Sequence, residues 1–107
     1  MRAFLLAFND SLVPRQMMQN SLDKVPEILN WLAILQGGIF LTSDSSAQQL
    51  SQRIREQYPY LHFVVAELPR GFNDGFLPQV GWDFINDPKP SSLQSLLRQL
   101  LPPPAKK

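Results

Sequence analysis

Two short apolar runs on either side of Gln36, Gly37 and Gly38 constrain the fold of this chain most. The runs are WLAIL at residues 31–35 and IFLT at residues 39–42, each of strand length and rich in aromatic or β-branched residues. The glycine pair tolerates the positive φ angles of a tight turn, whereas a helix through it would lose about 1 kcal/mol at each glycine relative to alanine. The sequence therefore predicts a β-hairpin here, with a loop into a single strand as the alternative.

Apolar runs of strand length also lie before and after this hairpin. Residues 2–8 are apolar on both faces, which is typical of a strand buried in the middle of a sheet. This run is too short for a secretory signal and ends at two polar residues, so we interpret it as a strand. Residues 61–68 (LHFVVAEL) are aromatic and β-branched and predict the last strand.

The first predicted helix covers residues 13–25, between the first strand and the hairpin. Asp10 or Ser11 can cap its N-terminus, and the chain leaves helical geometry before Pro26. An apolar stripe at three- and four-residue spacing marks the buried face. The stripe consists of Val13, Met17 or Met18, Leu22 and Val25.

The second predicted helix lies between the hairpin and the last strand. Asp44 or Ser45 begins it, Ser45 with Gln48 makes a capping box, and Pro59 closes it. Its buried stripe consists of Ala47, Leu50, Ile54 and Tyr58.

The resulting order is strand, helix, strand, strand, helix, strand. With right-handed crossovers, this order predicts an α+β domain of the ferredoxin-like βαββαβ type, in which a four-stranded antiparallel sheet carries two helices on one face. We assign this single domain to residues 1–86 and a C-terminal helical arm with a mobile tail to residues 87–107. Residues 79–85 (QVGWDFI) can add a fifth strand to the chain's own sheet or to that of a partner, and residues 93–101 predict a short leucine-rich helix. Either segment can be an arm exchanged between subunits.

Composition argues against several classes of function. Ten basic and nine acidic side chains give a net charge of +1, so no overall basic character points to nucleic acid. No apolar run approaches the roughly 18 residues that span a bilayer, so we expect no membrane association. The absence of cysteine excludes disulfides and thiolate metal sites, and it is compatible with the reducing cytoplasm in which we expect the protein to reside.

Four stretches follow one another over residues 2–68: AFLLAFND, the hairpin NWLAILQGGIFLTSD, the helix SSAQQLSQRIRE and the strand LHFVVAEL. In this order they resemble the SinR-like ferredoxin-fold proteins, relatives of the small CRISPR-associated family of scaffold and nuclease-like proteins. The resemblance implies a ferredoxin-like fold and frequent homodimers. For some members of the wider group it also implies nucleic-acid binding or metal-dependent cleavage.

The resemblance also implies a position for chemistry at the end of the first strand. There the family has an aromatic residue followed by an aspartate that, paired with its dimer mate, can hold a divalent metal. The order here is Phe8-Asn9-Asp10, so Asp10, with Asn9 beside it, is the candidate catalytic and Mg²⁺-binding residue. Asn9 occupies the matching place but lacks the anionic oxygens that Mg²⁺ favours, and helix capping by Asp10 is the alternative. The residues themselves indicate no catalytic group and no cofactor.

Two classes of function remain. We favour a small homodimeric interaction module of unassigned biological role, which binds itself or another protein, because long apolar sheet edges invite pairing. The alternative is a metal-dependent nuclease or nucleic-acid-binding protein, which would need a basic groove. The arginines available for that groove are Arg2, Arg15, Arg53, Arg55 and Arg70, and the predicted interaction residues are Phe63, Val65, Trp82, Phe84, Leu96, Leu97 and Leu100.

Overall fold

The computed structural model describes residues 1–91, which follow the order β, α, β, β, α, β, α. The strands are β1 (Arg2–Phe8), β2 (Asn30–Leu35), β3 (Gly38–Ser43) and β4 (Phe63–Glu67). The helices are α1 (Arg15–Leu22), α2 (Ala47–Gln57) and α3 (Gln79–Asn86).

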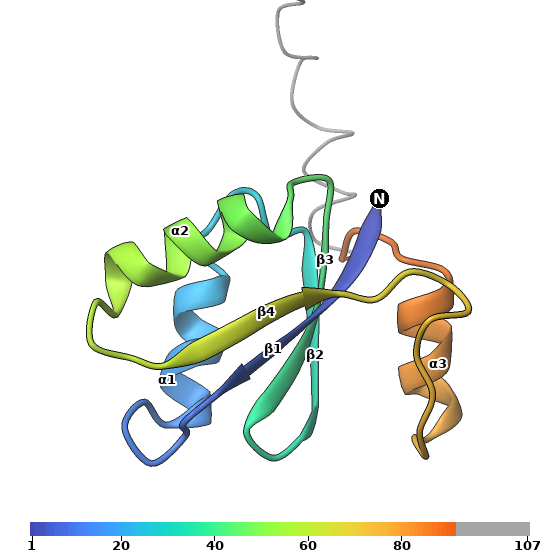
Figure 1. Cartoon of the computed structure of the whole chain (residues 1–107), viewed down its shortest axis with the longest axis horizontal. Coiled ribbons are helices and arrows are strands. Elements are labelled where there is room, and N and C mark those ends of the chain that lie inside the picture. Colours follow the sequence, from blue (N-terminus) through green and yellow to red (C-terminus); the bar gives the residue numbers. More distant parts are fainter. Residues whose placement is uncertain (92–107) are drawn as a thin grey trace, which may run out of the picture.

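The four strands form one antiparallel sheet in the order β2-β3-β1-β4 (Figure 1). In its centre, β1 pairs with β3 on one side and with β4 on the other, so that Leu6 lies opposite both Ile39 and Val65. The result is an α+β architecture with an antiparallel sheet, compatible with the ferredoxin-like fold that the sequence predicts.

The predicted hairpin is confirmed. β2 and β3 pair with Leu35 opposite Gly38, which leaves Gln36 and Gly37 to make the turn. Gly37 has a φ of 71°, in the left-handed region that glycine adopts without steric cost. Gly37 therefore forms the turn, as a glycine pair between two strand-length runs predicts.

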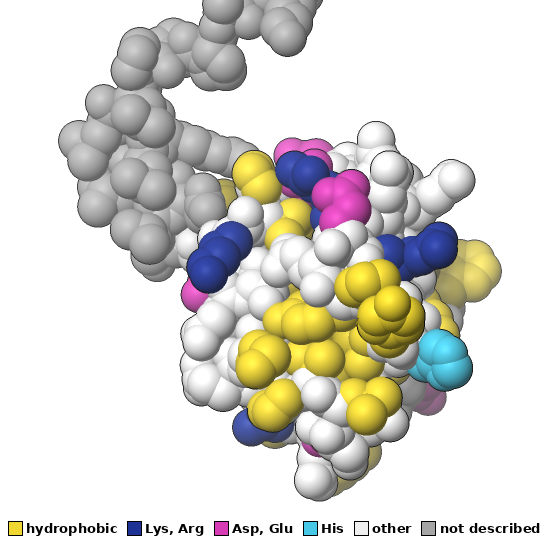
Figure 2. Space-filling view, turned by 90° about the vertical axis from the view of Figure 1, so that its left-hand side faces the viewer, with side chains coloured by type: hydrophobic (Ala, Val, Ile, Leu, Met, Phe, Trp, Pro, Cys, Tyr) yellow, Lys and Arg dark blue, Asp and Glu magenta, His cyan; other side chains and the backbone are white. Residues whose placement is uncertain are grey.

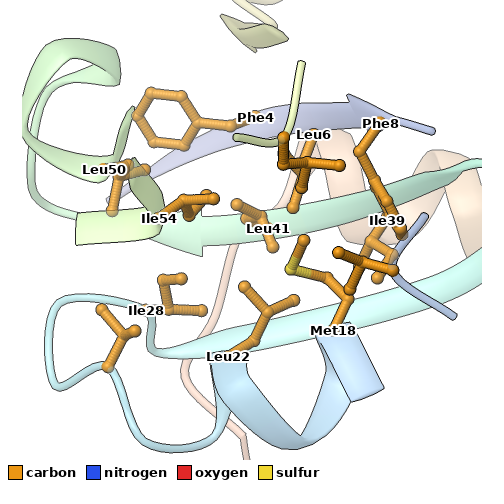
Figure 3. Close-up of a cluster of buried hydrophobic side chains, with 13 residues drawn as sticks. Phe4, Leu6, Phe8, Met18, Leu22, Ile28, Ile39, Leu41, Leu50 and Ile54 are labelled. Atoms are coloured by element: carbon orange, nitrogen blue, oxygen red, sulfur yellow. The ribbon is translucent and has the colours of Figure 1, made fainter. Parts of the chain in front are cut away.

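The larger core lies between the sheet and the two helices α1 and α2. Because side chains alternate along a strand, Phe4, Leu6 and Phe8 of β1 all point to this face. In Figure 3 they lie against one another and against side chains from β3, from both helices and from the segment that precedes β2. The partners labelled there are Met18, Leu22, Ile28, Ile39, Leu41, Leu50 and Ile54, all of them buried.

The opposite face of the sheet is covered by α3, so the expectation of a fifth strand at residues 79–85 is wrong (Figure 1). Ile85 of α3 is buried with Ala3 of β1 and Phe40 of β3. A further strand at the sheet's edge would leave these apolar residues in water, whereas a helix laid across the face buries them.

A strand-like alternation hides the helical spacing in the sequence of α3. Val80, Trp82 and Phe84 alternate as in a strand, but the buried positions Gly81 and Ile85 are one helical turn apart. Gly81 also permits the close approach of α3, because a Cβ atom there would lie 2.8 Å from Ile34 Cδ1. Packing against the sheet thus decides the conformation.

Helix α1 is shorter than the predicted range 13–25, and neither Asp10 nor Ser11 caps it. Its N-cap residue is Pro14, which provides no side-chain hydrogen bond but has the fixed φ that suits the start of a helix. After Leu22 the chain continues in a turn, in which the Val25 N–H donates to the Leu22 carbonyl at 3.2 Å. Val25 is therefore buried as predicted, but outside the helix.

The capping box of α2 is confirmed in kind but lies one residue later than predicted. Ser46 Oγ accepts from the Gln49 N–H at 3.1 Å, and Gln49 Oε1 accepts from the Ser46 N–H at 2.9 Å. Ser45 and Gln48 do not form the box, because the Ser45 N–H donates instead to Ser43 Oγ at 3.0 Å. This contact holds Ser45 in the turn that precedes the helix.

Two leucine substitutions test the assignment of the core. Leu41 is fully buried in the larger core, whereas Leu12 is exposed. We expect Leu41→Ala to lower the free energy of unfolding by about 2–5 kcal/mol, since it leaves a cavity, and Leu12→Ala to change it by less than about 0.5 kcal/mol. Urea unfolding of both variants measures the difference, and equal losses would contradict the packing described.

Candidate functional site

The outer edge of the sheet at β4 is the first surface that could bind a partner. Phe63 and Val65, which the sequence analysis names as interaction residues, direct their side chains toward the larger core and are half-buried. Val64 lies between them, points to the other face, and is 62% exposed. The exposed apolar side chains that β4 offers to a partner are therefore Val64 and Ala66, together with the backbone of the edge.

The other predicted interaction residues divide into two groups. Trp82 and Phe84 of α3 are half-buried and pack on the second face of the sheet. Beside Trp82, the loop that joins β4 to α3 borders an apolar recess of about 240 Å³, and Phe76 of this loop is fully exposed. Leu96, Leu97 and Leu100 lie outside the described residues.

A second apolar surface lies where the end of α2 meets the start of α1. A hollow of about 310 Å³ is lined there by Leu12 and Val13 and by residues 57–61. Hydrophobic side chains gather at the centre of this side of the molecule (Figure 2). Tyr60 is 93% exposed and Leu12 is 66% exposed, so two large apolar side chains stand in solvent at this hollow.

Tyr58 anchors one wall of the hollow. Its hydroxyl lies within hydrogen-bond distance of Ser21 Oγ on α1 and, at 3.5 Å, of the Met17 carbonyl. Ser21 Oγ also donates to the Met17 carbonyl at 3.0 Å. These contacts tie the end of α2 to α1 and fix the position of the Tyr58 ring.

The candidate metal position lies in the turn that follows β1. Asn9 Oδ1 accepts from the Ser11 N–H at 3.0 Å, and the Asn9 carbonyl accepts from the Leu12 N–H at 3.2 Å. Asn9 therefore shapes the turn, and Asp10 lies beside it, half-exposed. Within residues 1–91, no group of three or more histidine, cysteine, aspartate or glutamate side chains is placed to hold a metal ion.

The candidate arginines are distributed over different parts of the molecule. Arg2 pairs with Glu67 at 3.1 Å at one end of β1, whereas Arg15 donates to the Leu35 carbonyl at 3.2 Å beside the hairpin turn at the other end. These ends are separated by about 17 Å of strand. Arg70 lines a recess with Arg2 and Glu67, and Arg55 lies exposed on α2.

Arg53 is engaged by two acidic side chains. Its Nε lies 2.8 Å from Glu27 Oε2 and its Nη1 lies 3.5 Å from Glu56 Oε2. The hydrogen bond and the opposite charge of Glu27 raise the pKa of Arg53 above its ordinary value, with a smaller contribution from Glu56. The charge of Arg53 is thus largely compensated within the domain.

Neither the hollow nor the outward position of Val64 is predicted from the sequence. One signal for the hollow was available, because Tyr58-Pro59-Tyr60 follows the second helix and places a tyrosine beyond the last buried position. The direction of the β4 side chains could not be read from LHFVVAEL, in which both faces carry apolar residues.

The chain matches no family model, and neither the curated proteins nor the solved structures provide a match. No helix within residues 1–91 is long and apolar enough to cross a membrane.

Two tyrosines at the hollow make a matched pair of variants. We expect Tyr58→Phe to lower the free energy of unfolding by about 1 kcal/mol, because it removes the hydroxyl that bonds to Ser21. Tyr60→Phe should leave stability unchanged, since no hydrogen bond of the Tyr60 hydroxyl is formed within residues 1–91 and its ring is exposed. Thermal or urea unfolding provides the comparison, and equal stability of the two variants would show that the Tyr58 contact does not join the helices.

Proposed function

We propose that this chain is a small interaction module that acts as a homodimer and has no catalytic role of its own. The observation that carries the proposal is the grouping of exposed apolar side chains, at the hollow around Leu12 and Tyr60 and on the outward side of β4 at Val64 and Ala66. Single exposed apolar residues are common on monomers, whereas groups of them mark surfaces that bind a partner. We infer that this partner is a second copy of the chain.

The proposal includes the finer assignment of the fold as ferredoxin-like βαββαβ, with α3 as an addition on the second face. The order of the elements and the central position of β1 support it. It also includes the resemblance to the SinR-like proteins, among which homodimers are frequent. It includes the cytoplasm as the compartment in which we expect the module to act, and the absence of cysteine is compatible with that reducing compartment.

The positions of the arginines favour this function over nucleic-acid binding. A phosphate backbone is bound by several cations gathered on one surface. Arg2 and Arg15 lie at opposite ends of the sheet, and Arg53 is paired with Glu27 and Glu56. This distribution supports a module that binds protein.

The mass of the protein in solution tests the homodimer. One chain has a mass of 12.2 kDa, and we expect light scattering after size-exclusion chromatography to give twice that value at the upper end of the micromolar range. Dilution should return the mass to that of one chain, because an interface built on exposed surfaces is in equilibrium with the free subunits. A mass of one chain at every concentration up to millimolar would overturn the proposal.

A titration with labelled RNA and duplex DNA tests the alternative. At low and moderate salt, with and without Mg²⁺, we expect neither salt-sensitive binding nor cleavage, since the arginines within residues 1–91 do not gather into a basic groove. Asp10→Ala is the matched variant, because Asp10 is the candidate metal ligand. Binding that weakens with salt, together with cleavage that is lost in Asp10→Ala, would replace the interaction module with the nuclease.

A further inference from the structure

The pairing of β4 with β1 determines which backbone groups remain at the outer edge of the sheet. The Leu68 N–H donates to the Ala3 carbonyl at 2.8 Å, and the register places Leu5 opposite Ala66 and Ala7 opposite Val64. In an antiparallel pair, positions that exchange hydrogen bonds alternate with positions that do not. Val64, Ala66 and Leu68 therefore bond to β1.

The remaining residues of β4 direct their backbone N–H and C=O groups away from β1. Phe63, Val65 and Glu67 lie opposite Phe8, Leu6 and Phe4, at the positions that do not bond to β1. Independent support comes from β1, where the Phe8 N–H donates to the Gly37 carbonyl on the β3 side at 3.0 Å. The N–H and C=O groups of Phe63, Val65 and Glu67 therefore point outward, and no strand within residues 1–91 pairs with that edge.

We propose that two copies of this chain pair antiparallel through β4, with Val65 opposite Val65 of the second copy. The proposal rests on the homodimer proposed above and specifies how it forms. In this register Phe63 lies opposite Glu67 of the other copy, so all three residues with outward backbone groups bond to one another in reciprocal pairs. A shift by one residue sets these groups against residues that bond to β1, and a shift by two residues leaves only two of the three pairs. The two sheets then join into one continuous sheet.

The side chains of β4 are compatible with this pairing. On the second face, Val64 lies opposite Ala66 of the other copy, so two exposed apolar residues meet. Glu67 is the strand's single charged residue, and it faces Phe63 of the other copy while Arg2 compensates its charge. Edge strands that avoid pairing carry proline, charged side chains or a bulge. β4 has no proline, no lysine and no bulge, and its one charged side chain, Glu67, is paired with Arg2 of the same chain.

Cysteine cross-linking tests the register. The chain has no cysteine of its own, so Val64→Cys and Ala66→Cys each introduce one thiol. In the proposed dimer, position 64 of one copy lies opposite position 66 of the other, in a pair that exchanges no backbone hydrogen bonds. The Cα atoms of such a pair are about 4.5 Å apart, a separation that a disulfide can span. We expect mild oxidation of an equimolar mixture to give the mixed disulfide as the main cross-linked product, read from intact mass. Either variant alone, or Ala66→Cys mixed with Val80→Cys, should give little.

A lysine substitution tests the same edge without oxidation. Val64 and Val80 have similar exposures, 62% and 54%, but Val80 lies on α3. Val64→Lys should weaken self-association by about tenfold or more, because it places a charge in the joined sheet, whereas Val80→Lys should leave it unchanged. The unfolding midpoint confirms that both variants fold.

The outcomes separate the two proposals. If Val64→Lys still dimerises and the mixture of Val64→Cys and Ala66→Cys gives no mixed disulfide, pairing through β4 is overturned and the homodimer stays in place. An unmodified protein that stays monomeric at all concentrations would overturn the homodimer itself.

Discussion

Every layer of this domain depends on β1, because the strand is apolar on both faces and needs a neighbour on both sides. Leu6 points into the core beneath α1 and α2, and Ala3 points to the face beneath α3. Since buried backbone groups need hydrogen-bond partners, β3 and β4 must flank the strand. The burial of β1 therefore requires the sheet, the two helices on one face and the third helix on the other.

The same requirement produces the surface through which we expect the protein to act. β4 satisfies the backbone of β1 but receives no strand on its own outer side within the described part of the chain. Phe63 and Val65 are held against the core by their side chains, which keeps the outward backbone groups in an extended, regular row. A second copy presents the complementary row after a two-fold rotation, which is the basis of the self-association that we propose.

Local signals in the sequence predicted much of this fold, and packing decided the rest. Gly37 and the runs around it identified the hairpin because a positive φ angle and strand-length apolar segments are local properties. Residues 79–85 were misread as a strand, since their helical conformation depends on an uncovered sheet face that is distant in sequence. The outward direction of Val64 depends likewise on register with β1, and the hollow at Tyr60 depends on two helices meeting.

Amide hydrogen exchange along β4 tests pairing through this strand most directly. In the free chain, Val64 and Ala66 bond to β1 and should exchange slowly, while the Val65 N–H points to solvent and should exchange quickly. We predict that the Val65 amide becomes protected by at least about tenfold as the concentration rises into the range of the dimer. Fast exchange at Val65 at every concentration, with Val64 and Ala66 protected throughout, would contradict the account.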